Sequence, residues 1–328
     1  MDTVKESAGE TIRQAMNLLS RCRQEMGKRI IGQEGVINGL FMGLIAGGHV
    51  LLEGVPGLAK TLMVQTLAEV LDLDYKRIQF TPDLLPSDLI GSLVYRQETG
   101  AFEARKGPVF TNIVLADEIN RAPAKVQSAL LEAMQERQVT LGNETYPLPE
   151  PLFVLGTQNP IEQEGTYALP EAQLDRFLLK LKVSYLSNEN ELQVLRRMGV
   201  EKKIPVNTIL TAEKLLELRE AINLVRIEPG IQEYIVAIIA ATRERDRLVH
   251  PYAKFIDFGA SSRGSLGLHR CARASALFQG RDYVLPDDVK TVCPDVLRHR
   301  LVLSYEAESE GLDGDDVIAH ILKVVPVP

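Results

Sequence analysis

The sequence predicts an α/β fold: a parallel five-stranded sheet with helices, followed by a smaller, all-α domain. Short apolar runs that end in polar residues are typical of buried strands, and they alternate with segments whose apolar residues recur every three or four positions. After a charged junction at 201–205, helical patterns dominate, with starts at Thr211, near Ile231, at 259–264 and at Pro286. We therefore expect two domains, residues 1–200 and 201–328, the first opening with a polar-faced helix up to about residue 28.

A glycine-rich turn follows the first apolar run, residues 48–53, and precedes a helical pattern at 61–71. The turn consists of Gly54, Val55, Pro56, Gly57, Leu58, Ala59, Lys60 and Thr61, with Leu62 next. Between a strand and a helix, such a turn aims backbone N–H groups and the helix N-terminus at a phosphate. Lys60 would reach the terminal phosphates, and Thr61 would offer its hydroxyl to Mg²⁺. Ala59 stands where this motif has glycine, and its methyl group is a small obstacle to close phosphate approach.

A second apolar run, residues 111–116, ends in two carboxylates, Asp117 and Glu118. We expect this strand to neighbour the strand before the glycine-rich turn, which would place Asp117 beside a bound Mg²⁺. Glu118 could then polarise a water for attack on the γ-phosphate, which favours hydrolysis over transfer to a small molecule. Alone, the pair could merely cap the next helix, which we expect to start at Ala122-Pro123.

Two further strands are expected at residues 152–158 and 178–183. The first ends at Asn159, whose amide could orient the attacking water, and the second follows Asp175 and Arg176. Two hairpins are also expected, within residues 81–110 and 138–148, because alternating residues flank turn-forming ones there. The hairpins could face the pore of a ring or be passive surface decoration, and the sequence leaves both readings open.

Taken together, these motifs resemble those of the AAA+ ATPases, and the whole chain is similar to the MoxR family, which has an insert in the second helix of the core. The most specific stretches are 54–61, 81–88, 99–102, 107–110, 116–123 and 169–177. The resemblance implies a P-loop AAA+ core and a helical lid, with ATP and Mg²⁺ as cofactors. It also implies that residues 54–62 bind the phosphates and that Ile30 and Ile31 lie against the adenine, although two isoleucines could simply belong to the core.

The same resemblance implies roles for three polar residues. Asn159 occupies the position called sensor 1, and Arg176 that of an arginine finger, which reaches into the neighbouring subunit's site. Arg263, at a helix start, matches sensor 2, an arginine that reaches from the lid to the γ-phosphate of the same chain. The alternatives are a salt bridge from Arg176 to Asp175 or Glu171, and a solvated Arg263.

Composition excludes several classes of protein. The net charge of −7 and sequence pI near 5.5 argue against a broad nucleic-acid-binding surface. The cysteines, Cys22, Cys271 and Cys293, have no metal-binding spacing, which predicts reduced thiols in a cytoplasmic protein. The most apolar stretch, about residues 39–52, is too short to span a bilayer and no signal peptide is visible, so we expect no membrane insertion.

The resemblance further implies an ATP-driven remodeller or chaperone that acts as a homo-oligomeric ring, a hexamer. Such proteins typically work with a separate partner carrying a von Willebrand factor A domain and assist the maturation of protein complexes or the insertion of metal cofactors. Two alternatives remain: a DNA-associated motor and a slow nucleotide-dependent switch. Stimulation by DNA and multiple turnover, respectively, would distinguish them, and the client protein is not identifiable from the sequence.

Overall fold

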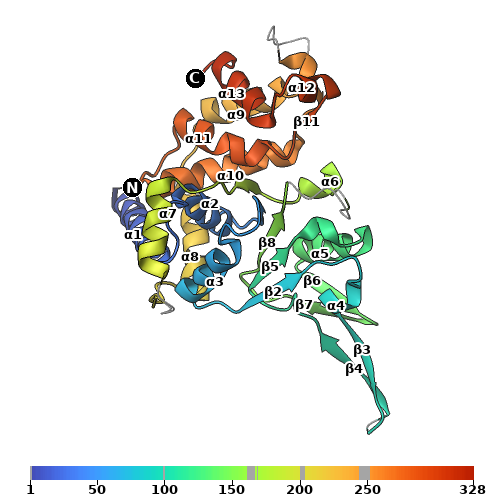
Figure 1. Ribbon diagram of the computed structural model, residues 1–328. Helices are drawn as coiled ribbons and strands as arrows, with labels where there is room; N and C mark the ends of the chain where they lie inside the picture. Colours follow the sequence, from blue (N-terminus) through green and yellow to red (C-terminus); the bar gives the residue numbers. More distant parts are fainter. Residues whose placement is uncertain (1, 99, 161–166, 168, 200–203, 244–251) are drawn as a thin grey trace.

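The computed structural model describes residues 2–98, 100–160, 167, 169–199, 204–243 and 252–328. A twisted sheet with helices packed around it forms one part of the molecule, and a group of helices from the carboxyl-terminal third lies against one end of that part (Figure 1). Most of the junction expected at 201–205 lies outside the described residues, so the division at residue 200 stays a prediction.

Five parallel strands form the sheet, in the order β2-β5-β8-β1-β9. They are β1 (Val50–Glu53), β2 (Tyr75–Gln79), β5 (Ile113–Asp117), β8 (Phe153–Gln158) and β9 (Leu179–Lys182). The expectation that the strand ending in Asp117 neighbours β1 was wrong, because β8 lies between β5 and β1 and pairs with both. Since all four pairings are parallel, the carboxyl ends of the strands meet at one edge, where open α/β sheets place their ligands.

Helices precede, connect and follow these strands. Those before residue 200 are α1 (Asp2–Met26), α2 (Glu34–Ile45), α3 (Lys60–Leu71), α4 (Pro86–Ile90), α5 (Ala124–Glu136), α6 (Glu171–Leu174) and α7 (Asn188–Met198). Those after it are α8 (Ala212–Ala221), α9 (Pro229–Ala241), α10 (Ser262–Phe278), α11 (Pro286–Leu297), α12 (Tyr305–Ser309) and α13 (Gly314–Val324). The described part of this carboxyl-terminal group, the lid, is mainly helical as predicted. It also contains a short antiparallel pair, β10 (Ile256–Phe258) with β11 (Val302–Leu303), and an isolated β-bridge between Arg226 and Tyr283.

Local sequence sets where several of these helices begin. The Thr211 hydroxyl accepts a hydrogen bond from the Lys214 N–H and caps α8, as expected for a threonine before a helix. The helix after the acidic pair, α5, begins at Ala124 and not at Ala122-Pro123. The reason is a 3₁₀ turn (Ile119–Arg121) that follows the acidic pair and leaves Pro123 extended at the N-cap, with ψ at 153°.

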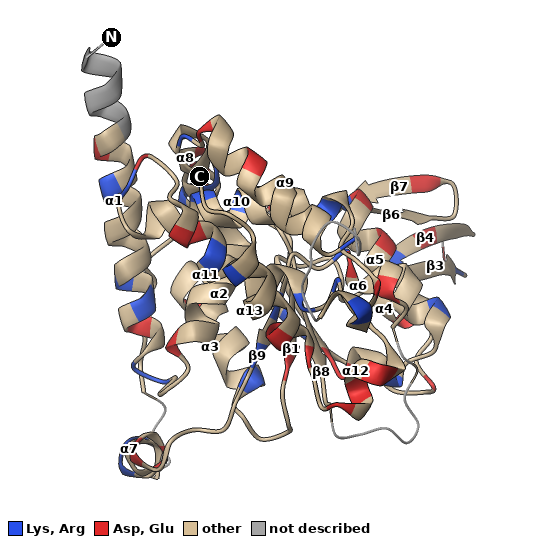
Figure 2. Cartoon of the chain, turned by 90° about the horizontal axis from the view of Figure 1, so that it is seen from above, with Lys and Arg blue, Asp and Glu red and all other residues tan. Residues whose placement is uncertain are grey.

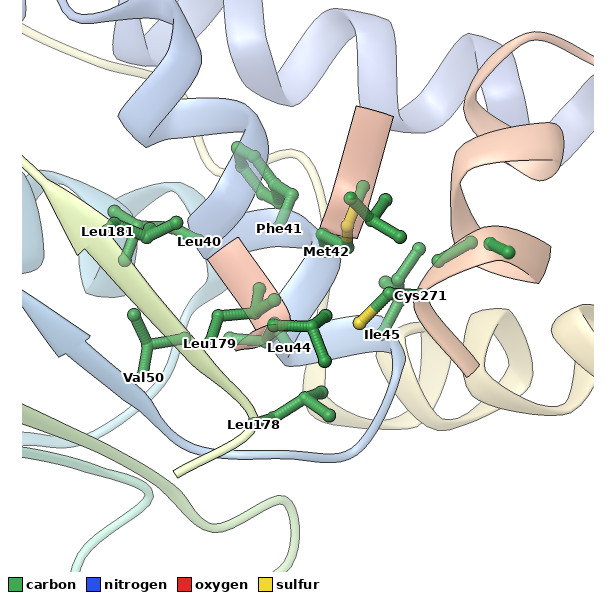
Figure 3. Close-up of a cluster of buried hydrophobic side chains, with 14 of the residues drawn as sticks. Leu40, Phe41, Met42, Leu44, Ile45, Val50, Leu178, Leu179, Leu181 and Cys271 are labelled. Carbon is green, nitrogen blue, oxygen red and sulfur yellow. The ribbon is translucent and has the colours of Figure 1, made fainter. Parts of the chain in front are cut away.

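One apolar core joins the sheet to the lid. Helix α2 is buried along most of its length and lies between β9 and α10. Figure 3 shows Leu40 and Leu44 near Leu179 and Leu181 of β9, while Ile45 lies near Cys271 of α10. A second cluster, on the other face of the sheet, packs α5 and the 138–148 hairpin against it. The lid is therefore held to the sheet by continuous apolar packing as well as by polar contacts.

Both predicted hairpins are present. The first pairs β3 (Gly91–Arg96) with β4 (Ala101–Lys106), and the second pairs β6 (Gln138–Leu141) with β7 (Glu144–Pro147). The first hairpin extends away from the body of the molecule (Figure 1) and exposes Tyr95 and Phe102, whose ring centroids are 5.3 Å apart. Whether it faces a pore stays a prediction.

Charged residues of both signs are interspersed over the helices (Figure 2). Within the described part of the chain, no helix combines the length and the apolar character needed to cross a membrane.

Candidate active site

The glycine-rich turn joins the end of β1 to the start of α3, at the carboxyl edge of the sheet. The Gly54 N–H donates to the Gln158 carbonyl at 3.1 Å, which ties the turn to β8. A Cβ atom at Gly54 would lie 2.7 Å from the Val183 carbonyl oxygen, so only glycine fits here. The Lys60 ammonium, on the first residue of α3, donates to the Gly54 carbonyl and thus lies folded over the turn.

Ala59 departs from the glycine of this motif, and the structure shows what that departure costs. Its φ is 55°, in the left-handed region, as is that of Gly57 two residues earlier, at 85°. For a residue with a side chain this conformation costs roughly 1–2 kcal/mol. The structural consequence is therefore backbone strain at the N-cap of α3, in addition to the bulk of the methyl group expected from the sequence. Such strain is typical of ligand-binding turns held by the surrounding fold.

Asp117 ends β5 and is 8% exposed. Its Oδ2 accepts hydrogen bonds from Arg77 Nε at 3.0 Å and Nη2 at 2.6 Å, and its Oδ1 accepts one from the Thr157 hydroxyl at 2.6 Å. Arg77 lies on the adjacent strand β2, directly opposite Leu115. Charge-assisted bonds of this kind fix the orientation of the carboxylate. Neither Arg77 nor Thr157 was singled out from the sequence.

Glu118 adopts an unusual backbone conformation directly after the end of β5. Its φ is 56° and its ψ 51°, left-handed values that are rare for glutamate. Its N–H donates to the Thr157 hydroxyl at 2.8 Å, so Thr157 holds both members of the acidic pair. The Glu118 Oε2 accepts hydrogen bonds from Gln79 at 2.8 Å and Arg121 at 3.2 Å. This carboxylate is therefore oriented by two neighbours at the edge of the sheet.

Most of the predicted site residues line a single pocket of about 420 Å³. It is lined by Pro56, Gly57, Ala59, Lys60, Thr61, Leu62, Arg77, Asp117, Glu118 and Asn159. Asn159 is buried and directly follows β8. Thr61 and Asp117 both line this pocket, and a hydroxyl and a carboxylate supply oxygen ligands of the kind that suits Mg²⁺. Asp117 Oδ1 accepts only the Thr157 hydroxyl and keeps a further lone pair for a metal ion, whereas Arg77 occupies both lone pairs of Oδ2, so the donor set fits the metal through Oδ1.

A second, apolar cavity of about 330 Å³ adjoins the glycine-rich turn. Ile30 and Ile31 line it together with Leu58 and Leu62, as expected for a surface that accepts a flat base. Its other wall comes from α7 and the residues before it. These wall residues, which were not predicted from the sequence, are Leu186, Val194 and Leu195.

Arg176 and Arg263 lie together, apart from the glycine-rich turn. Both line a cavity of about 300 Å³ that also contains Arg137, Arg270 and Arg300, and neither is among the residues that line the pocket of Lys60. Arg176 Nη1 donates to the Leu131 carbonyl at 2.8 Å, and Arg263 Nη1 is 3.5 Å from Asp175 Oδ2. Among the ion pairs of the described residues, Asp175 pairs with Arg263 and Arg300 rather than with Arg176. The structure therefore does not bring Arg263 to the glycine-rich turn of its own chain.

The fold and this site define a class. These are the parts of an AAA+ nucleotide-binding ATPase domain: a parallel sheet with a P-loop at its carboxyl edge, an acidic pair at the end of β5, a buried asparagine after β8 and a helical lid. Family models agree with the architecture: residues 49–179 match the ATPase family associated with various cellular activities (AAA), and residues 252–321 match an AAA lid domain.

Individual relatives identify the family within this class of ATPases. Chaperone MoxR1 of Mycobacterium tuberculosis is 49% identical over 95% of this chain and 83% of its own length. The YeaC protein of Bacillus subtilis is 46% identical over 95% of both chains, and the MoxR protein of Methylorubrum extorquens is 31% identical over 94% of this chain and 95% of its own. A solved structure of a candidate ATPase from Cytophaga hutchinsonii superimposes with a TM-score of 0.91 at 52% identity, covering 98% of each chain. The chain belongs to the MoxR family of AAA+ ATPases.

Proposed function

We propose that this protein binds ATP with Mg²⁺ and hydrolyses it to ADP and phosphate. The observation that carries the proposal is the convergence of Lys60, Thr61, Asp117, Glu118 and Asn159 on one pocket at the end of the sheet. Lys60 and the N-terminal N–H groups of α3 hold the phosphates. Thr61 and Asp117 hold the metal ion, which when bound neutralises charge on the phosphates.

Glu118 and Asn159 act on the water. The Glu118 carboxylate, fixed by Gln79 and Arg121, accepts a proton as the water attacks the γ-phosphate. The Asn159 amide orients that water from the neighbouring strand end. Ile30 and Ile31, with the wall formed by α7, hold the adenine in the apolar cavity next to the turn.

Arg176 and Arg263 serve the site of a neighbouring subunit in a homo-oligomeric ring, a hexamer. The support is their shared, arginine-lined cavity, which is distinct from the pocket of Lys60 in the same chain. An arginine delivered from a neighbour stabilises charge that develops during phosphoryl transfer. For Arg263 this replaces the expectation of a contact within its own chain.

ATP turnover in such a ring drives the remodelling of client proteins in the cytoplasm. By its family, the protein is a chaperone-type ATPase that works with a separate von Willebrand factor A-domain protein and assists the maturation of protein complexes or the insertion of metal cofactors. The likeness to Chaperone MoxR1 over 95% of this chain supports the chaperone role, while the partner and the kind of client are proposed from the family resemblance alone. In this proposal residues 1–200 form the ATPase core and residues 201–328 the lid.

Substitution at Glu118 tests the proposal directly. Glu118→Gln should bind ATP with normal affinity but hydrolyse it at least about a hundredfold more slowly, the scale of losing a general base. Lys60→Ala should instead lose affinity for ATP, because it removes a charge that holds the phosphates. Binding is measured with a fluorescent ATP analogue, and turnover by phosphate release.

Glu132→Gln, the same change of charge on the exposed face of α5, is the matched control and should leave turnover unchanged. Near-normal turnover in Glu118→Gln would remove Glu118 as the base and leave the hydrolytic assignment without support.

A further inference from the structure

Arg300, on the segment after α11, directs most of its hydrogen bonds at one short stretch of the core. Its Nε donates to Asp175 Oδ1 at 2.8 Å, and its Nη2 donates to the carbonyls of Asp175 and Phe177 at 3.2 and 2.6 Å. Its Nη1 donates to the Leu178 carbonyl at 3.1 Å. Its other contacts, with the Val296 carbonyl and His299, stay within the lid. A lid side chain thus holds the backbone of the core on both sides of Arg176.

The Asp175 carboxylate collects further contacts from the lid. Besides Arg300 on Oδ1, the Ser261 hydroxyl donates to Oδ2 at 2.8 Å and Arg263 lies 3.5 Å from the same oxygen. Ser261 is the N-cap of α10, and its hydroxyl also accepts from the Arg263 N–H. Three lid residues therefore meet the residue directly before Arg176, at the boundary where α6 approaches α10 (Figure 1).

The chemistry at this point requires arginine. Arg300 is 7% exposed, and a buried guanidinium is tolerated only when its donors are satisfied. Its planar fork reaches a carboxylate and three carbonyls at once, which the single ammonium of a lysine cannot do. With Asp175, Phe177 and Leu178 held in this way, the lid sets the position of the Arg176 backbone, while the Arg176 side chain is held by the Leu131 carbonyl of the core.

Another lid arginine provides an internal comparison. Arg298 also crosses to the core, where its Nη1 donates to the Lys180 carbonyl of β9, and it pairs with Asp295 and Asp315 of the lid. It holds the lid to the sheet without touching the stretch around Arg176. Substitutions at these two arginines therefore test two different roles: Arg298 attaches the lid to the sheet, and Arg300 also places Arg176.

We propose that Arg300 is the positioning residue of Arg176: it fixes the backbone of the arginine that completes the neighbouring subunit's site, and so links the placement of the lid in one subunit to turnover in the next. This inference rests on the proposed role of Arg176 in the neighbouring site.

The test combines kinetics with mixed rings. Arg300→Lys should lower kcat about 10- to 100-fold while KM for ATP stays unchanged, because the displaced group acts in the transition state of a neighbouring site. Mixing it with Lys60→Ala should restore part of the activity, since a Lys60→Ala subunit still presents a well-placed Arg176. Mixing it with Arg176→Ala should restore nothing. Arg298→Lys is the matched control and should keep a kcat near that of the parent.

The reference mixture is Lys60→Ala with Arg176→Ala, with co-assembly verified by differently tagged subunits. If this reference pair stays inactive, the shared site itself fails, and the role of Arg300 fails with it. If the reference pair recovers but Arg300→Lys keeps its kcat, or recovers with Arg176→Ala, the shared site stands and the positioning role is overturned. Asp175→Asn, which keeps the shape of the partner, should behave as Arg300→Lys does and covers the case in which the buried lysine prevents folding.

Discussion

At the scale of single residues, polar side chains buried near the sheet edge hold the active site in shape. Thr157 is 1% exposed and joins the backbone of Glu118 to the carboxylate of Asp117. His49, directly before β1, accepts a hydrogen bond from the Val154 N–H on Nδ1, and its Nε2 lies 3.3 Å from the Met134 carbonyl. Because the first contact needs an acceptor and the second a donor, His49 is neutral and carries its proton on Nε2.

This buried neutral histidine makes stability depend on pH. Burial lowers the pKa of His49 from its ordinary 6.5 to about 4. Between these values the unfolded chain binds a proton that the folded chain does not, so stability is full above about pH 6.5 and is lost as the pH falls toward 4. The contribution is about 3 kcal/mol, at 1.36 kcal/mol per unit.

The measurement is urea unfolding of the parent and His49→Asn between pH 7 and pH 4. The parent should be the more stable at pH 7, and the difference in free energy of unfolding should shrink as the pH falls. Parallel curves for the two proteins would show that His49 does not titrate as its burial implies.

At the scale of elements, the packing of α2 on the sheet depends on small residues at the contact. A Cβ atom at Gly43 would lie 2.5 Å from Val50 Cγ2 of β1, with Phe153 and Leu179 close behind. At Gly35, near the start of the same helix, a Cβ atom would meet nothing within 4 Å. Only the first glycine is therefore required by close approach, because β-branched Val50 has little freedom to move aside.

Paired substitutions on α2 test this reading. Gly43→Ala should destabilise the protein by about 1–3 kcal/mol, the usual cost of overpacking a core. Gly35→Ala should be neutral or stabilise it by up to about 1 kcal/mol, because alanine is the better helix former. Chemical denaturation of both variants gives the comparison. Equal destabilisation would mean that the α2–sheet contact is looser than this packing.

At the scale of the whole molecule, charged contacts join the lid to the edge strand of the sheet. Lys182, on β9, pairs with Asp313 at 2.8 Å and Asp315 at 2.7 Å, both at the start of α13. These groups are partly exposed, so the pair adds little to stability, and the shared apolar core supplies most of the attachment. The arginine-lined cavity lies at this same boundary between lid and core, with lining residues from both.

A site completed by a neighbouring subunit makes activity depend on assembly. Diluting the protein through the range in which the ring dissociates should lower ATP turnover per subunit, while ATP binding per subunit stays nearly constant. The residual turnover of Arg176→Ala should change less with dilution, because its sites no longer receive Arg176 from the neighbour. Light scattering at each concentration reports the assembly state. Constant turnover per subunit across dissociation would mean that each chain holds a complete site.

The sequence by itself determined the parts whose signal is local. Each of these parts occupies a short stretch in which residue types at fixed spacing specify a conformation. They are the P-loop, the acidic pair, the asparagine after β8, both hairpins and the capped lid helices. The edge strand β2 was not located, because its sequence, Tyr75–Gln79, is polar and mostly exposed and lacks the apolar run that marks the inner strands. The amphipathic helix α7, which walls the apolar cavity, was also missed.

Only the tertiary structure decided what depends on residues far apart in the chain. The order of the strands in the sheet places β8 between β5 and β1 and brings Arg77 to Asp117 across 40 residues. The docking of the lid on the sheet brings Arg300 to Asp175 across 125 residues. No local spacing encodes such contacts, because their formation depends on the packing of whole elements. For the same reason, Arg263 was recognisable at a helix start, while its place beside Asp175 was visible only once the lid had been docked.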